Sequence, residues 1–202
     1  MPSKSAQKHE SKKDDILSIC MDTFWEKGFH RTSMRDLCSA LAMSPGALYR
    51  YFSSKEEIIQ AMIRRDQSLL ENAFSEIPAH TSFPSILRKM HAIGEQLFGD
   101  KKSLSFYNQL HAEASVNPTI ALVLKRQCAS VTDRLELEVR RGQERGEIIT
   151  FHDPRLLAIF IMSSFDGLAP RATVDPEFDW KKASETFIEL ILRLLTMEGN
   201  PS

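Results

Sequence analysis

The sequence has few cysteines and no long apolar run. Its 202 residues include 3 cysteines, and none of them forms a C-x-x-C pair, so the sequence indicates neither a disulfide scaffold nor a cysteine-based metal site. Nowhere do about eighteen apolar residues follow one another, and the polar, basic residues 1–13 contain no apolar leader segment. These absences argue against export and membrane spanning. We expect a protein of the reducing cytoplasm with no membrane partner.

The sequence also lacks the short motifs of common enzyme and metal sites. It contains no G-x-G-x-x-G, no G-x-S-x-G and no H-E-x-x-H. Gly94 and Gly99 have the glycine spacing of a phosphate-binding loop, but Asp100 stands where that loop needs lysine. The 6 histidines are scattered without i,i+4 pairs or neighbouring cysteines. We therefore expect no enzymatic activity, no metal site and no cofactor.

What the sequence does contain is helical periodicity. Apolar residues recur at three- and four-residue spacing along nearly the whole chain, and no alternating strand pattern or internal repeat is present. Hydrophobic residues make up 42% of the chain, which is sufficient for a core. The pattern predicts an all-α protein. The expected helices, about nine, cover residues near 11–27, 34–41, 45–52, 54–77, 83–98, 104–114, 118–145, 154–167 and 180–197.

Two short helices separated by a tight break are predicted between Thr32 and Phe52. Thr32 and Ser33 supply side-chain oxygens that can cap the first helix, and Ser44 followed by Pro45 is a typical start for the second. Leu48 and Phe52 lie four residues apart, so both can pack inward. This pattern is typical of a helix-turn-helix, in which the second helix enters the major groove of DNA.

The residues left on the outer side of this unit suit DNA. Small residues let a helix approach base edges, arginine can reach guanine or phosphate, and tyrosine hydroxyls can donate to phosphate. Ser53 and Glu56 have the spacing of a capping box for the next helix, and Lys55 lies near that positive helix end, where a phosphate could bind. The candidate DNA-binding residues are Thr32, Ser33, Arg35, Ser44, Pro45, Gly46, Ala47, Tyr49, Arg50, Tyr51 and Lys55.

Charge is distributed unevenly along the chain. The formal net charge is −1, but residues 1–55 hold nine lysines and arginines against six acids, which leaves seventeen against twenty-one for the rest. The basic excess therefore lies with the predicted DNA-binding segment, as an electrostatic footprint should. Because the excess is small, we expect DNA affinity to need two copies of the motif.

Three motifs lie in register between Phe24 and Ile59. They read F-W-E-K-G-F-H-R-T-S-M, M-S-P-G-A-L-Y-R-Y-F and S-K-E-E-I-I, and the run that contains them is about a fifth of the chain. This region resembles the DNA-binding region of the TetR family of transcriptional regulators, and it departs from the family at Ala42, where glycine is common. The resemblance implies a helix-turn-helix head, residues 11–58, joined by one long helix to a body, residues 59–200, that binds a ligand and dimerises.

By the same resemblance, the helices of the body surround an effector cavity. Such cavities are mostly apolar with a few polar anchors, and Tyr107 and His111, four residues apart, are the candidate anchors. The candidate ligand-binding residues are Met90, Ile93, Leu97, Phe106, Tyr107, Leu110, His111 and Phe165. The alternative for each of these side chains is that it simply fills the core.

The last two predicted helices are too apolar to lie on the surface of a small monomer. They predict a four-helix bundle with a second copy of the chain, which would set two heads over successive major grooves about 34 Å apart. The alternative is core packing without dimerisation. The candidate interface residues are Leu157, Phe160, Ile161, Phe187, Ile191 and Leu194.

The sequence thus predicts a ligand-responsive repressor. As a homodimer it would bind a palindromic operator in double-stranded DNA and release it when a small lipophilic effector enters the body. Two alternatives stay open: a constitutive DNA-binding or architectural protein without an effector, and a helical enzyme or partner-binding protein in which the helix-turn-helix has no role.

Overall fold

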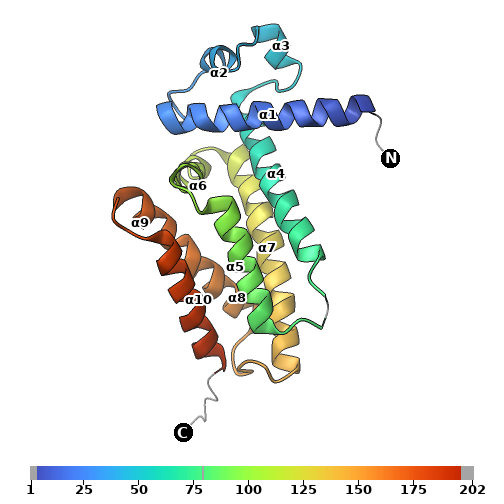
Figure 1. The fold of residues 1–202 in the computed structure, drawn as a ribbon, viewed down its shortest axis with the longest axis vertical. Coiled ribbons are helices and arrows are strands. Elements are labelled where there is room, and N and C mark those ends of the chain that lie inside the picture. The colour runs from blue at the N-terminus through green and yellow to red at the C-terminus, as the bar shows by residue number, and fades with distance from the viewer. Residues whose placement is uncertain (1–3, 79, 197–202) are drawn as a thin grey trace.

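The structure, a computed structural model, describes residues 4–78 and 80–196. Within these ranges it contains helices and no strand, so the predicted all-α class is confirmed. Figure 1 shows α1 to α3 as a head that lies across one end of an elongated body. The helices are α1 (Lys4–Lys27), α2 (Met34–Ala40), α3 (Pro45–Tyr49), α4 (Lys55–Ser75), α5 (Phe83–Phe98), α6 (Lys101–Ala114), α7 (Pro118–Glu144), α8 (Pro154–Asp166), α9 (Leu168–Val174) and α10 (Trp180–Thr196).

The helices differ from those predicted at several places. The first helix begins at Lys4 and not near Ser11. A short further helix, α9, follows α8 where the sequence predicted a stop, because Gly167 keeps a right-handed φ of −65° and Pro170 falls in the first turn of α9, where proline is tolerated. Residues 197–200, the last of the predicted body, lie outside the described residues. No helix in the described part of the chain is both long and apolar enough to cross a membrane.

One buried cluster joins the head to the body. Phe24, Leu37 and Leu48 come from the three head helices, and they pack with Ile59 and other residues of α4. The cluster continues into α6 and α7 through Phe106, Leu110, Ile120 and Leu124. The predicted division between residues 58 and 59 therefore falls inside a continuous helix and inside a continuous core.

A second cluster holds the far part of the body together. It is built from buried side chains of α5, α7, α8 and α10, such as Phe83, Val139, Ile161 and Ile188. In Figure 1, α8 and α10 lie on the side of the body away from α4. Helix α4 extends from the head along the body, and Phe74 near its far end packs with Ile86 of α5, so both ends of this helix are anchored by packing.

Candidate functional site

The first helix of the helix-turn-helix, α2, is fixed by a reciprocal cap. The Ser33 hydroxyl accepts a hydrogen bond from the Asp36 N–H at 3.2 Å, and the Asp36 carboxylate accepts one from the Ser33 N–H at 2.8 Å. Lys27 at the end of α1 donates to the same carboxylate at 2.6 Å. The ammonium of Lys27 and then the hydrogen bonds from Ser33 hold the pKa of Asp36 well below its usual range. These contacts connect the end of α1 to the start of α2.

The turn between α2 and α3 is built on Ala42. Its φ is +50°, in the left-handed region that a side chain disfavours. The Ala42 N–H donates to the Ser39 carbonyl at 3.2 Å, and the Met43 N–H donates to the Cys38 carbonyl at 3.0 Å, which is the Schellman pattern of a helix end. Alanine here adopts the conformation that a glycine would take more easily, so the departure from the TetR pattern is accommodated as local strain.

The second helix, α3, covers only Pro45–Tyr49 and is shorter than predicted. Ser44 caps it by accepting from the Ala47 N–H at 3.3 Å, and Leu48 is fully buried beneath it. The opposite side is open: Tyr49 is 51% exposed, Arg50 is exposed, and no atom lies within 4 Å of the position that a side chain on Gly46 would take. Figure 1 places α2 and α3 at the outer end of the molecule, clear of the body.

Most of the predicted DNA-binding residues are exposed. Ser33, Arg35, Ser44, Pro45, Gly46, Tyr49 and Arg50 are exposed, and Ala47 is half-buried. This side of the head presents small residues next to an arginine and a tyrosine hydroxyl. The arrangement can approach a DNA groove without a main-chain obstacle.

The structure corrects the placement of three predicted contacts. Thr32 is only 2% exposed and its hydroxyl donates to the Gly28 carbonyl at 2.8 Å, which removes it from the DNA-facing set. Tyr51 is half-buried, and its ring stacks on His9 with a centroid distance of 4.9 Å. Lys55 is half-buried, and its ammonium donates to the Phe29 carbonyl at 2.8 Å and lies 4.8 Å from the centre of the Phe29 ring, so this ammonium already has partners within the protein.

The start of α4 is capped one residue later than expected. Ser54, and not Ser53, is the N-cap and accepts from the Glu57 N–H at 3.2 Å. The Glu57 carboxylate, and not that of Glu56, returns to accept from the N–H and hydroxyl of Ser53 at 2.6 and 2.7 Å. These hydrogen bonds lower the pKa of Glu57.

The peptide of Phe29 joins the head to the body. Its N–H donates to the Gln109 side-chain oxygen on α6 at 2.9 Å, and its carbonyl accepts from Lys55 at the start of α4 at 2.8 Å. Beside it, the His30 ring lies 3.2 Å from the carboxylate of Glu113, also on α6. The loop between α1 and α2 is therefore held by both helices that lead into the body. We refer to the two hydrogen bonds of the Phe29 peptide as the Phe29 junction.

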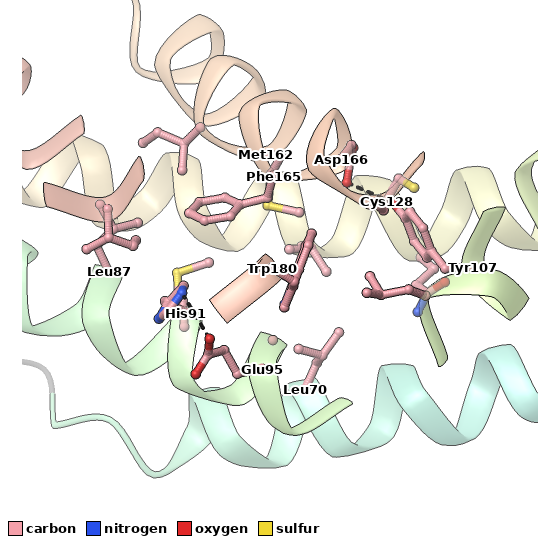
Figure 2. Close-up of a pocket in the computed structure, with 18 of the residues that line it drawn as sticks. Leu70, Leu87, His91, Glu95, Tyr107, Cys128, Met162, Phe165, Asp166 and Trp180 are labelled. Atoms are coloured by element: carbon pink, nitrogen blue, oxygen red, sulfur yellow. Dashed lines mark hydrogen bonds and ion pairs between the residues drawn. The ribbon is translucent and has the colours of Figure 1, made fainter. Parts of the chain in front are cut away.

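The body encloses a cavity of about 160 Å³. Figure 2 shows apolar and aromatic side chains around most of it, with polar pairs at two places. The lining residues are Leu70 and Phe74 of α4; Leu87, Met90, His91, Gly94 and Glu95 of α5; Leu104 and Tyr107 of α6; Leu124, Gln127, Cys128 and Val131 of α7; Ile161, Met162, Phe165 and Asp166 of α8; Ala169 of α9; and Trp180 and Ile188 of α10.

Two carboxylates mark the polar places in the cavity. The Glu95 carboxylate accepts from the Ser184 hydroxyl at 3.1 Å and lies 3.8 Å from Nε2 of His91. The Asp166 carboxylate accepts from the Tyr107 hydroxyl at 2.8 Å. Burial raises the pKa of Asp166, and burial together with this carboxylate raises the pKa of Tyr107.

Two nitrogens in the cavity wall are also without a hydrogen-bond partner among the described residues. They are Nε2 of His91 and Nε1 of Trp180, and both atoms are buried. A bound molecule with acceptor oxygens could satisfy the indole N–H. The cavity thus offers an apolar volume with a few directional polar groups, as small-molecule sites do.

Three of the predicted ligand-binding residues, Met90, Tyr107 and Phe165, line this cavity, and the other five do not. Phe106 and Leu110 lie on the other side of α6, where they pack in the head cluster against residues such as Phe24. The remaining predictions concern His111, which is exposed with its ring 4.4 Å from that of Tyr107, and Ile93 and Leu97, which are half-buried outside the lining.

The predicted ligand-binding residues did not include Glu95, Asp166 or Trp180, which line the cavity. Glu95 and Asp166 interrupt helices that are otherwise apolar on their inner sides, and Trp180 begins α10. A carboxylate at the end of a run as apolar as Ile159–Phe165 was the available signal for Asp166.

The predicted dimer residues divide into two groups. Leu157, Ile161 and Ile191 are buried in the second cluster of the chain itself, so they are not available to a partner. Phe160 and Leu194 are 50% and 58% exposed, and Phe187 is half-buried. The apolar residues exposed on α8 and α10, which we call the α8/α10 face, are Leu156, Ile159, Phe160, Leu190 and Leu194.

A capped helix-turn-helix on an all-α body defines the class of helix-turn-helix transcriptional regulators. Residues 16–62 match the family described as bacterial regulatory proteins, tetR family, and residues 89–196 match the family described as BetI-type transcriptional repressor, C-terminal. The chain belongs to the TetR family and is a DNA-binding transcriptional regulator; proteins of this family are regulators and not enzymes.

Individual relatives agree with this membership. The chain is 33% identical to the HTH-type transcriptional regulator UidR of Escherichia coli (strain K12) over a matched segment of 134 residues. This segment covers 66% of this chain and 67% of UidR. It is similar to Salmonella enterica GusR at 26% identity and a TM-score of 0.74, covering 91% of this chain and 94% of the other. The transcriptional regulator FadR from Bacillus subtilis in complex with stearoyl-CoA shares the fold, with 18% identity, a TM-score of 0.78, and coverage of 89% and 97%.

Proposed function

We propose that the protein is a ligand-responsive repressor that binds a palindromic operator as a homodimer. A small molecule in the cavity of the body would then favour an arrangement in which the two heads no longer fit the operator. The observation that carries this proposal is the open side of α3, where Tyr49 and Arg50 are exposed. The next helix, α4, leads from this part of the head to the cavity, where it contributes Leu70 and Phe74 to the wall.

The α8/α10 face supports a dimer. Five large apolar side chains are exposed there on two helices of the same side of the body. A contiguous apolar face is costly in water and is typical of a subunit interface. Two such faces would form a four-helix bundle, and its two-fold axis would set the heads at a fixed spacing on the DNA.

The route from cavity to head supports ligand control. Leu70 and Phe74 of α4 and Tyr107 of α6 line the cavity, and the same two helices carry Lys55 and Gln109, which hold the Phe29 junction. A molecule that displaces either helix must therefore shift the attachment of the head. A coupling of about 1–3 kcal/mol would change operator affinity by about 5- to 150-fold.

The cavity lining supports a small, largely lipophilic effector. Most of the wall is apolar, and the volume of about 160 Å³ suits a compact molecule. The related fold of FadR holds stearoyl-CoA, which supports the idea that a body of this shape can accept a ligand. No membrane partner enters the proposal.

The test begins with the selection of bound sequences from a random duplex pool at moderate ionic strength. We expect a palindromic site to be enriched. Arg50→Ala should then weaken binding to that site by about 5- to 150-fold, since a specific base contact is worth roughly 1–3 kcal/mol. Arg126→Ala removes an equally exposed arginine from α7 and should leave operator affinity unchanged. A pool without any preferred sequence, or an Arg50→Ala protein that binds like the parent, would contradict the proposal.

The ligand part of the proposal is tested separately on the selected operator. Compounds small enough for the cavity are added to the protein–operator complex, and release is followed by fluorescence anisotropy. Release by at least one compound that also binds the free protein is expected. If every compound that binds leaves operator affinity unchanged, the protein is a constitutive DNA-binding regulator and its body serves dimerisation alone.

A further inference from the structure

The charge of the cavity wall restricts the class of molecule that it can hold. Among the described residues that line it are two carboxylates, those of Glu95 and Asp166, and no lysine or arginine. An anionic ligand would enter a largely apolar space without an arginine or lysine to pair with, next to two groups of its own sign. Burial of an unpaired charge is strongly unfavourable, so the wall selects against anions.

The two carboxylates differ in how well they are already paired. Glu95 accepts from the Ser184 hydroxyl at 3.1 Å and has Nε2 of His91 at 3.8 Å. Asp166 forms no ion pair with any described residue and accepts from the neutral hydroxyl of Tyr107 at 2.8 Å. His111 lies next to Tyr107 and favours the charged form of Asp166, but it is exposed and outside the lining.

The surroundings of Asp166 favour a positive charge at this place. Asp166 lines the cavity but is itself exposed, so the charged group of a ligand can reach its carboxylate, and partial desolvation by the surrounding protein raises the pKa of this carboxyl. The aromatic rings of Phe165, Trp180 and Tyr107 line the same cavity, and ring faces attract cations. Figure 2 shows Asp166 and Tyr107 together on one side of Trp180, with His91 and Glu95 on the other.

We propose that the effector is an organic monocation, an amine or quaternary ammonium on a compact apolar body, whose charged group lies against Asp166. The proposal rests on the proposed function, because it names the effector of the same cavity. The volume of about 160 Å³ limits the apolar body to roughly one ring, since a cavity of about 150 Å³ lined by apolar residues holds benzene.

The test compares three probes of nearly equal shape and different charge. They are 3-phenylpropylammonium, 3-phenylpropan-1-ol and 3-phenylpropionate, titrated calorimetrically into the full chain at neutral pH without DNA. We expect the cation to bind about tenfold or more tightly than the alcohol, and the anion to bind weakest. The proposal is overturned if the anion binds as tightly as the cation, or if none of the three binds.

Two variants test whether the charged group of the cation binds at Asp166. Asp166→Asn keeps an acceptor for the Tyr107 hydroxyl. We expect it to weaken binding of the cation by about 10- to 100-fold and to change the affinity for the alcohol by no more than about threefold. Glu144→Gln removes an exposed carboxylate of α7 outside the cavity and should change neither. Equal cation affinity in Asp166→Asn and the parent would overturn the assignment. If Asp166→Asn does not fold, as judged by circular dichroism, the order of the three probes on the parent protein still decides.

The same probes separate this inference from the proposed function. If the cation binds through Asp166 but the operator complex persists, the ligand class stands and the repressor mechanism fails. If the anion both binds more tightly and releases the operator, the repressor mechanism stands and the ligand class fails.

Discussion

The Phe29 junction makes a quantitative prediction about Gln109. Gln109→Met keeps the length and much of the volume of the side chain but removes the oxygen that accepts from the Phe29 N–H at 2.9 Å. Phe29 is only 6% exposed, so its N–H is left with little access to water. A buried donor without a partner costs about 1–3 kcal/mol, and the partial burial of this bond places the expected loss at about 1–2 kcal/mol.

That loss can be measured globally and locally. For a chain of this length we expect the melting temperature to fall by roughly 2–8 °C, at about 2–4 °C for each kcal/mol. Hydrogen exchange at the Phe29 amide should accelerate by about 5- to 30-fold if that amide exchanges by local opening. Gln96→Met makes the same exchange at an exposed position of α5 and should leave both quantities unchanged.

A specific result would refute the reasoning. If Gln109→Met melts within about 1 °C of the parent and exchange at Phe29 is unaltered, the hydrogen bond does not hold the head. If the melting temperature falls but exchange at Phe29 does not change, the loss arises from packing elsewhere on α6. In either case the coupling route through α6 would have to be abandoned.

Three further predictions concern single groups. Ala42→Gly should stabilise the protein by about 0.5–1 kcal/mol in urea unfolding, because relief of about 1–2 kcal/mol at φ +50° exceeds the added backbone entropy of about 0.5–1 kcal/mol; a loss of stability would contradict this. The pKa of Asp36 is lower in the folded protein than its ordinary value of 3.8, so its contribution is complete above about pH 4 and is lost as the pH falls further. In urea unfolding measured from about pH 6 downward, the stability difference between the parent and Asp36→Asn should therefore shrink below about pH 4. A difference that stays constant would argue against the Lys27–Asp36 contact. Burial raises the pKa of Cys20 to about 12, whereas Cys128 is exposed and lines the cavity. Iodoacetamide at about pH 8 should therefore modify Cys128 before Cys20, as followed by mass spectrometry. A ligand in the cavity should slow the modification of Cys128.

The head could be predicted from the sequence because its signals are local. Ser44 followed by Pro45 fixes the start of α3, and Leu48 marks its inner side, all within five residues. The register of the next cap was predicted one residue early, since Ser53 and Ser54 can both serve and only the position of Glu57 decides between them.

The cavity could not be predicted in the same way. Helical spacing shows which residues share a side of α6, but Phe106 and Tyr107 both belong to buried surroundings, one in the head core and the other in the cavity wall. Periodicity does not say which neighbouring helix each side meets. On α8 the same difficulty arises, because Leu156 and Leu157 are equally apolar and only packing against the rest of the body determines which one faces outward.

The Phe29 junction also bears on how such regulators could be recombined. Both of its hydrogen bonds use main-chain atoms of the head, so they depend on the path of the backbone after Gly28 and not on the side chain at position 29. A head taken from another regulator could therefore be grafted onto this body without redesigning those two attachments, provided that it follows the same path. Hybrid switches with a new operator and an old inducer would need Gln109 and Lys55 kept in place, together with head side chains that pack on Phe106 and Leu110 as Phe24 does here.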